Sequence, residues 1–206
     1  MNTLAALDVI GSAMAQAQLK LFDAPPVLPE GMRYQADLIR PDEERSLVAF
    51  VETLPFKPFE FAGGFLGNRR IVSFGWRYDY QAQQLAESKP IPSELLPLRR
   101  KAARLAGCDP ESFQQALVTE YAPGAGIGWH KDKPMFGDVV GVSILAACRF
   151  RLRRRQGMTW ERASFVAEPR SAYLLSGPSR TLWEHSIPPL DRLRYSVTFR
   201  NFASEP

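Results

Sequence analysis

The sequence predicts a mainly β protein of the α+β class, with N-terminal helices and a β-ribbon before a barrel or sandwich of antiparallel strands. From residue 113 to 202, short runs rich in β-branched and aromatic residues recur about every ten residues, separated by Gly, Pro, Asp or Ser turns. Two earlier segments carry a proline or a glycine where helices begin or end. With 206 residues, the chain has the length of one domain with a small appendage.

The N-terminal part of the chain carries the predicted helices. Residues 1–23 form an extension rich in Ala, Leu and Gln that favours a helix, and a Pro-rich connector follows it. The segment 36–39 looks like a strand, and a helix is expected to start at Pro41, where three acids favour the positive helix end. A second helix is predicted over 93–106, with Gly107 ending it.

The remaining segments are predicted to be extended. Residues 57–80 are rich in Phe, Gly, Arg and Tyr, which predicts a strand with a turn at Phe74-Gly75. The β-rich core then runs from about 113 to 203. Its predicted strands are ALVTEY, VVGVSIL, CRFRLRR, ERASFVAE, SAYLLS, LWEHSI and LRYSVTFRNF. Residues 24–206 are therefore expected to form a single domain.

Composition excludes several classes of protein. With 45% hydrophobic and 23% charged residues, the chain matches a globular protein rather than a disordered or membrane-embedded one. Its two cysteines make no disulfide framework. The first 22 residues lack a basic n-region, and no run of 18 apolar residues occurs. We therefore expect a cytoplasmic monomer without membrane contact.

The chain is basic, with 26 Lys and Arg against 22 Asp and Glu and a pI of about 9.2. A pI above ~9 is typical of nucleic-acid binders, but many proteins that bind no nucleic acid share it. Basic residues cluster at 99–104 and at 149–155. Each cluster is either a solvated surface or part of a binding surface, and charge alone leaves this open.

Both histidines of the chain fall in the β-rich half, in a spacing that suits a metal. His130 lies in GWHKDKP, with Asp132 two residues later, and His185 lies in LWEHSIPP. On an extended strand, residues i and i+2 point to one face, so His130 and Asp132 are expected to share a face. With His185 they would form the two-imidazole, one-carboxylate triad of non-haem iron(II) oxygenases. The alternative is that both histidines are ordinary core or surface residues.

Two arginines stand on the last predicted strand, in RLRYSVTFR. Arg194, Ser196, Thr198 and Arg200 share one face of it, and the residues between them form an apolar face. Two cations on a mostly buried strand need anionic partners. A soluble dicarboxylate would supply them, because the planar fork of arginine binds a carboxylate bidentately. Structural pairing with Asp or Glu is the alternative.

At these residues the sequence resembles the AlkB-type family of Fe(II)/2-oxoglutarate-dependent dioxygenases. The matching segments are YAPGAGIGWHKD (121–132), VVGVSIL (139–145), SGPSRTLWEHSIPP (176–189) and RYSVTFR (194–200). Their order, the interval of 55 residues between the histidines and the final R-x-x-x-x-x-R match the family pattern, and the resemblance covers about residues 24–203. It implies a double-stranded β-helix, or jelly roll, with N-terminal helices and a substrate lid formed by the β-ribbon at about 57–80.

The resemblance also implies which residues hold the cofactors. His130, Asp132 and His185 would hold iron(II), and 2-oxoglutarate and O2 would be the cosubstrates. Tyr121 and Arg194 would bind the distal carboxylate of 2-oxoglutarate.

Three further residues are implied in the 2-oxoglutarate site. Arg200 would lie near the keto-acid end of the cosubstrate. Thr119 and Ser196 stand where the family often has asparagine. Both keep a hydroxyl that can form hydrogen bonds, so they are included in the predicted site.

The substrate is expected to bind at the lid. In relatives that act on nucleic acid, this region covers a flipped base, where aromatic rings can stack on the base and cations can meet phosphates. The candidate residues here are Arg69, Phe74, Trp76, Tyr78 and Lys133. The alternative for Phe74 and Trp76 is that they pack the ribbon onto the barrel.

The function expected from these observations is oxidative demethylation of alkylated DNA or RNA bases, as in DNA repair. One alternative is a hydroxylase or demethylase of a protein or a small molecule. Another is a nucleic-acid binding module with a decayed site, which would not turn over 2-oxoglutarate. A cupin-type ligand binder is a third, although cupin metal sites commonly carry more than two histidines.

Overall fold

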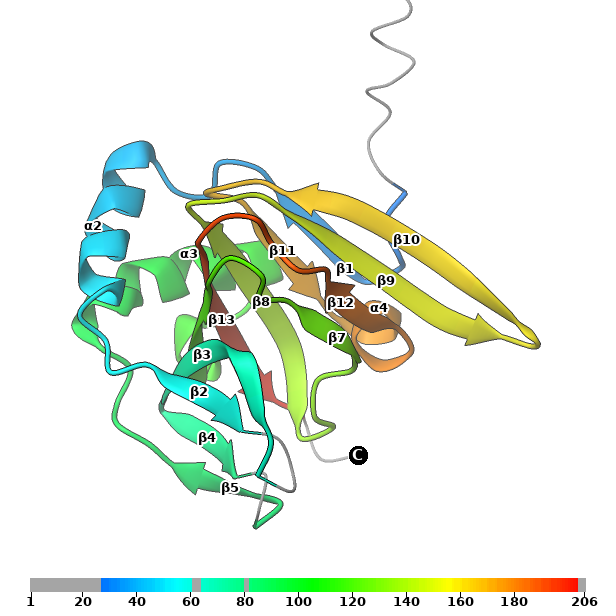
Figure 1. Cartoon of the computed structure of the whole chain (residues 1–206), viewed down its shortest axis with the longest axis horizontal. Helices are drawn as coiled ribbons and strands as arrows, with labels where there is room; N and C mark the ends of the chain where they lie inside the picture. The colour runs from blue at the N-terminus through cyan, green and yellow to red at the C-terminus, as the bar shows by residue number, and fades with distance from the viewer. Residues whose placement is uncertain (1–26, 61–63, 80–81, 204–206) are drawn as a thin grey trace, which may run out of the picture.

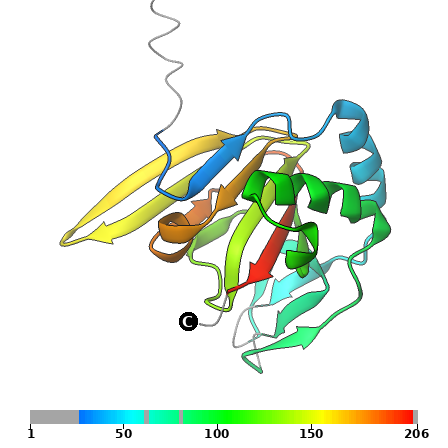
Figure 2. The same cartoon turned by 180° about the vertical axis from the view of Figure 1, so that it is seen from behind.

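The structure, a computed structural model, describes residues 27–60, 64–79 and 82–203 of the chain. The helix predicted within residues 1–23 lies outside this described part. Two antiparallel sheets face each other across a buried core, and helices lie behind the larger sheet (Figures 1 and 2). Among the described helices, none has the length and apolar composition that a membrane-spanning segment requires.

The larger sheet has seven strands in the order β1-β11-β8-β13-β6-β3-β2. Neighbouring strands are antiparallel throughout, and strands far apart in the sequence lie side by side. Its strands are β1 (Met32–Gln35), β2 (Lys57–Glu60), β3 (Leu66–Phe74), β6 (Gln115–Tyr121), β8 (Phe136–Ile144), β11 (Ala172–Leu175) and β13 (Arg194–Phe202).

The smaller sheet has four strands in the order β10-β9-β12-β7. Its strands are β7 (Ile127–His130), β9 (Cys148–Gln156), β10 (Thr159–Ala167) and β12 (Glu184–Ile187). Tyr121 and Tyr173 of the larger sheet form one buried apolar cluster with Phe150, Leu152 and Ile187 of the smaller sheet. The predicted jelly roll is therefore confirmed, and the hairpin of β9 and β10 projects from its body (Figure 1).

The helices cover the outer face of the larger sheet (Figure 2). They are α2 (Pro41–Val51), a 3-10 turn η1 (Ser93–Leu95) that leads into α3 (Leu96–Ala106), and two short elements elsewhere, η2 (Pro110–Ser112) and α4 (Gly177–Thr181). Both predicted helices are confirmed. α2 has three acids in its first turn, and α3 ends at Gly107, whose φ of 75° suits a residue without a Cβ.

Strand β13 separates the two halves of the interior. Its residues Tyr195, Val197 and Phe199 pack into the helix-side cluster, whereas Ser196 and Thr198 line a cavity on the opposite face. The predicted alternation is therefore confirmed, and it follows from the period of two along a strand.

Two predicted strands differ from the structure. The segment 36–39 is not a strand, because β1 ends at Gln35 and Asp37 adopts a φ of 47° that breaks the extended chain. The apolar residues Leu38 and Ile39 are nevertheless buried, in the helix-side cluster. In LWEHSI the strand starts at Glu184, since the preceding residues end α4.

The region predicted as a lid, about 57–80, belongs partly to the body of the protein. β2 and β3 are strands of the larger sheet, while β4 (Trp76–Asp79) pairs with β5 (Gln84–Glu87) in a separate ribbon. The turn predicted at Phe74-Gly75 is confirmed: Gly75 has a φ of 72° and lies between β3 and β4. A Cβ on Gly75 would lie 2.0 Å from the carbonyl oxygen of Gln114, so only glycine fits this approach.

Replacing Gly75→Ala should lower the free energy of unfolding by about 2 kcal/mol or more, because a strained φ and a backbone clash coincide there. Urea denaturation measures this change. Gly157→Ala is the matched control, since Gly157 also has a positive φ of 57° but has open space around it. Equal losses in the two variants would show that the close approach to Gln114 is not the constraint.

Candidate active site

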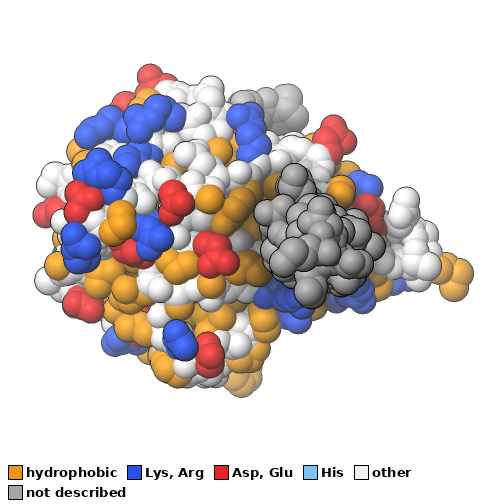
Figure 3. Space-filling model, turned by 90° about the horizontal axis from the view of Figure 1, so that it is seen from above, with side chains coloured by type: hydrophobic (Ala, Val, Ile, Leu, Met, Phe, Trp, Pro, Cys, Tyr) orange, Lys and Arg blue, Asp and Glu red, His pale blue; other side chains and the backbone are white. Residues whose placement is uncertain are grey.

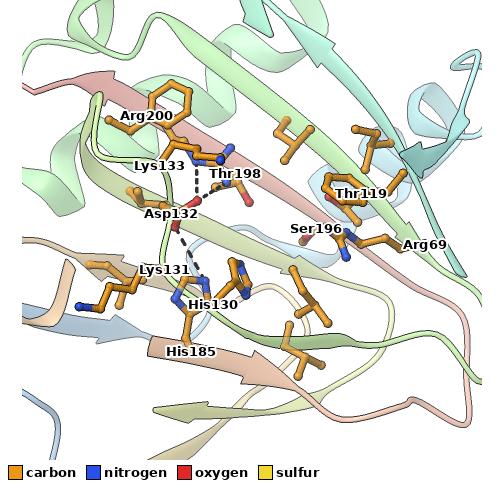
Figure 4. A pocket seen from close by; sticks show the side chains of 18 of the residues that line it. Arg69, Thr119, His130, Lys131, Asp132, Lys133, His185, Ser196, Thr198 and Arg200 are labelled. Atoms are coloured by element: carbon orange, nitrogen blue, oxygen red, sulfur yellow. Dashed lines mark hydrogen bonds and ion pairs between the residues drawn. The ribbon is translucent and has the colours of Figure 1, made fainter. Parts of the chain in front are cut away.

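A cavity of about 420 Å³ lies between the two sheets, and all three predicted iron ligands line it (Figure 4). His130 ends β7, and His185 lies opposite it on β12 in the pairing of the two strands. The centroids of the two imidazole rings are 4.3 Å apart. Nδ1 of His130 lies 2.9 Å from the carbonyl oxygen of Gly128, so it is the nitrogen that carries the proton there, and Nε2 is left available as a ligand.

Asp132 lies close to the two histidines, but it is not on the strand as predicted. β7 ends at His130, so Asp132 lies on the loop beyond the strand rather than on the strand itself. Its side chain still turns toward the histidines, with Oδ2 at 3.8 Å from Nε2 of His185. The loop is held by Arg180, which donates from Nη2 to the carbonyl oxygens of Lys133 (2.6 Å) and Phe136 (2.7 Å).

Arg200 is the charged partner of Asp132. Its Nη2 and Nε donate to Oδ1 of Asp132 at 2.7 and 3.1 Å, and its Nη1 donates to Gln115 at 3.0 Å. The side chains of Arg200 and Asp132 are 11% and 8% exposed, so the pair is largely shielded from water. Arg200 was predicted to lie near the keto-acid end of 2-oxoglutarate. In the structure its hydrogen bonds go to Asp132, the carboxylate of the triad, and to Gln115.

The protonation states suit a metal site. Burial, together with nearby His130 and Arg200, lowers the pKa of His185 to about 3. Burial also lowers the pKa of His130. For Asp132, burial alone would raise the pKa, but Arg200, the histidines and Arg180 hold it well below its usual range. The triad therefore offers two neutral imidazoles and one carboxylate anion, the forms in which these side chains bind metals.

The donor set fits iron(II). Two imidazoles and one carboxylate are the ligands of the facial triad, which leaves further positions open for a cosubstrate. In the described part of the chain, no three histidine, cysteine or carboxylate side chains lie close enough together to hold a metal ion as they stand. Within the triad, Nε2 of His185 and Oδ2 of Asp132 are 3.8 Å apart.

Among the described residues, Arg194 is the most deeply buried charged side chain. It is 0% exposed, and its Nε donates to the hydroxyl of Ser143 at 3.1 Å. Both terminal nitrogens, Nη1 and Nη2, are buried without a hydrogen-bond partner among the described residues. Because burying an unpaired cation is costly, these nitrogens indicate an anionic ligand. A carboxylate of 2-oxoglutarate fits this requirement.

Three other predicted 2-oxoglutarate residues lie on β6 and β13, the strands that pair at Arg194. Tyr121 lies opposite it in the pairing of β6 and β13, with the guanidinium 5.1 Å from the centre of the ring. Thr119 and Ser196 also lie opposite each other, and both line the cavity. The cavity lining thus includes the three predicted iron ligands and four of the predicted cosubstrate residues, Tyr121, Thr119, Ser196 and Arg200. Arg194 is buried beside Tyr121 and does not itself line the cavity.

The predicted substrate residues divide into two groups. Arg69, Tyr78 and Lys133 line the cavity, and Nζ of Lys133 lies 4.5 Å from the centre of the Tyr78 ring. Phe74 was wrongly predicted, because it is buried in the helix-side cluster. The reason is the alternation along β3: Arg69, like residues 71 and 73, faces the cavity, so residue 74 faces away.

Trp76 is also placed differently from its prediction as a substrate residue. Its ring packs edge-on against Phe202, with centroids 5.6 Å apart, and it is not among the residues that line the cavity. The alternative, that this tryptophan packs the ribbon onto the body of the protein, is the one the structure supports.

Several site residues were not foreseen. Phe150 stacks on His185 with centroids 5.2 Å apart, and the alternation of CRFRLRR was a signal for its inward position. Three others make hydrogen bonds to residues far away in the sequence. Arg180 bonds a residue 44 positions away, Gln115 one 85 positions away and Ser143 one 51 positions away. No local pattern in the sequence marks such contacts.

Comparisons with known proteins agree with this geometry. The family model of the 2OG-Fe(II) oxygenase superfamily matches residues 52–200. The tRNA (carboxymethyluridine(34)-5-O)-methyltransferase alkbh8 of Xenopus tropicalis is 26% identical over 172 residues, 80% of this chain and 26% of that protein. The Alkylated DNA repair protein ALKBH8 homolog of Arabidopsis thaliana is 26% identical over 197 residues, 83% of this chain and 55% of that protein. This chain thus spans about a quarter and about half of these two relatives.

Among solved structures, that of OsALKBH1 shares the fold, with a TM-score of 0.62 and 17% identity, over 84% of this chain and 98% of that one. The resemblance to AlkB-type proteins is thereby confirmed. With the family model matched over residues 52–200, the chain belongs to the 2OG-Fe(II) oxygenase superfamily.

Proposed function

We propose that the protein is an Fe(II)- and 2-oxoglutarate-dependent dioxygenase that removes methyl groups from alkylated bases of nucleic acid. The observation that carries the proposal is the buried guanidinium of Arg194, whose terminal nitrogens have no described partner. It lies against the ring of Tyr121, which lines the same cavity as two neutral histidines and an ionised aspartate. These groups match the needs of a dicarboxylate cosubstrate and of iron(II), respectively.

The residues of the chain would bind and orient the reactants. His130, His185 and Asp132 would hold the iron, and Arg194 would take the distal carboxylate of 2-oxoglutarate. When bound, iron(II) with 2-oxoglutarate and O2 supplies the oxidation of a substrate C–H bond, with succinate and CO2 as the coproducts. Arg200 keeps Asp132 ionised and oriented, and the apolar wall around Phe150 excludes water from the histidines.

A methylated base is a suitable substrate for this cavity. Its volume of about 420 Å³ lies within the range of small-molecule sites, and its lining includes Arg69, Tyr78 and Lys133. Hydroxylation of an N-methyl carbon gives a hemiaminal, which releases formaldehyde and restores the base. The names of the relatives, a tRNA methyltransferase and an alkylated-DNA repair protein, also support a nucleic-acid substrate.

Substitution of a metal ligand should abolish turnover. His130→Ala and Asp132→Ala should each remove iron-dependent decarboxylation of 2-oxoglutarate, measured as succinate release, because each deletes a ligand of the proposed site. Asp138→Asn is the control, since Asp138 is a nearby carboxyl on β8 outside the triad. Turnover retained in either ligand variant would remove the metal assignment.

Substitution of Arg194 should separate cosubstrate binding from stability. Arg194→Met should leave the thermal stability of the free protein equal or higher, because an apolar side chain replaces a buried unpaired charge. It should also abolish the rise in melting temperature that 2-oxoglutarate causes, which corresponds to about 2.7 kcal/mol at a hundredfold excess over Kd. Arg192→Met, an exposed arginine two residues away, should keep this rise. An unchanged response in Arg194→Met would contradict the assigned role.

The substrate class is tested by formaldehyde release. Single-stranded and duplex DNA, RNA and peptides, each carrying N-methyl groups, are incubated with the protein, iron(II) and 2-oxoglutarate. We expect release from at least one nucleic acid, with a KM that rises steeply with salt because phosphate contacts displace counterions. Release from methylated peptides alone, or a KM insensitive to salt, would assign the enzyme to another substrate class.

A further inference from the structure

The outer face of the smaller sheet carries a row of arginines that the proposed reaction does not use. Along β9, residues at alternate positions point outward, while Phe150 and Leu152 between them fill the core. In the strand pairing, Trp160 and Arg162 of β10 lie opposite outward residues of β9. We define the arginine–tryptophan face by Arg149, Arg151, Arg153, Arg155 and Arg162 together with Trp129 and Trp160.

The rings of the two tryptophans pack against the guanidinium groups of this face. Arg151 and Arg153 lie over the Trp129 ring, at 5.1 and 4.4 Å from its centre. Arg153 and Arg155 lie over the Trp160 ring, at 4.3 and 5.5 Å. Guanidinium groups and tryptophan rings thus alternate along the sheet. Their contacts are cation–π interactions, in which an arginine stacks on the face of an aromatic ring.

The face is strongly positive. Within the four strands, Glu184 is the acid on this side, and it pairs with Arg153 at 2.6 Å. Arg149 and Arg162 are exposed and contact no carboxylate in the described part of the chain. The face carries five arginines and one acid, and this excess of four positive charges equals the net charge of +4 of the whole chain. Figure 3 shows basic side chains gathered near the root of the projecting hairpin.

The face is continuous with the cavity. Trp129 lines the cavity and precedes the predicted ligand His130 in the sequence. A register shift in the pairing of β7 with β12 occurs beside it, and such irregularities re-aim side chains. Because the Trp129 ring lies against Arg151 and Arg153, this residue connects the cavity lining with the arginine–tryptophan face.

We propose that the arginine–tryptophan face binds the phosphodiester backbone of a single nucleic-acid strand, DNA or RNA, that leads into the cavity. The guanidinium groups suit phosphate oxygens, and the tryptophan rings suit unpaired bases, which stack on aromatic side chains. A duplex offers no free base faces to these rings. This inference rests on the proposed function, because it extends the binding of the same substrate beyond the cavity.

The test measures binding of an unmodified single-stranded oligonucleotide by fluorescence anisotropy at several salt concentrations. In the triple variant Arg149→Gln, Arg155→Gln, Arg162→Gln, binding should weaken about tenfold or more at low salt. The slope of log Kd against log salt should fall by about 2, since each phosphate contact with a single strand contributes ~0.7.

The matched control is Arg45→Gln, Arg100→Gln, Arg104→Gln, which removes three exposed charges from α2 and α3. It should bind almost as the unchanged protein does. Trp160→Leu should weaken binding without changing the salt slope, because it removes a stacking surface and no charge. Equal binding by the two triple variants would overturn the proposal, as would stronger binding of anionic lipid vesicles or polyglutamate than of the oligonucleotide.

Failure of this inference is distinguishable from failure of the proposed function. The binding assay needs neither iron nor turnover. If no methylated oligonucleotide releases formaldehyde but the face variant still loses binding, the docking face stands and the demethylase function fails. If formaldehyde is released and the face variant binds as the control does, the docking face alone is overturned.

Discussion

The ion pair between Arg200 and Asp132 is the interaction on which the site depends. Asp132 lies on a loop after β7, whereas Arg200 belongs to the last strand of the opposite sheet. The pair therefore fixes the loop of one sheet against the other. Because both groups are buried, removing one partner would leave an uncompensated charge, which typically costs 3–5 kcal/mol. Arg180 adds a second anchor through the loop carbonyls.

Along β13, apolar and polar side chains alternate, so the two faces of the larger sheet differ in chemistry. One face of this strand packs against the helices, and the other presents hydroxyl and guanidinium groups to the interior between the sheets. The helices thus support the wall that carries the polar groups without touching the cavity. Arg194 differs from the other polar groups of this strand, since its terminal nitrogens are buried without described partners, which is costly in the absence of an anion.

Residue type and spacing were sufficient to predict the centre of the site. His130, Asp132 and His185 share the cavity as expected, although Asp132 lies beyond the end of its strand. Phe74 was predicted on the wrong side of its strand. Neighbouring side chains of a strand point to opposite faces, so residue 73 faces the cavity and Phe74 faces the helix-side core. The segment 36–39 was misplaced because Asp37 adopts a φ of 47°, which ends the extended chain after Gln35.

The basic cluster at 149–155 could not be interpreted from its composition alone. Three of its arginines with odd numbers, at 151, 153 and 155, lie against Trp129 or Trp160 on the outer side. Arg154 instead pairs with Glu161 at 2.5 Å and lies over Trp183. Only the pairing of β9 with its neighbours separates these environments.

The same arginines bear on how copies of the protein meet. β10 is nine residues long and forms an edge of the smaller sheet, and such edges are templates for pairing with another chain. Like charges along the hairpin oppose the approach of a second copy in register. The arginines thus place an electrostatic barrier beside the unpaired backbone groups of this edge.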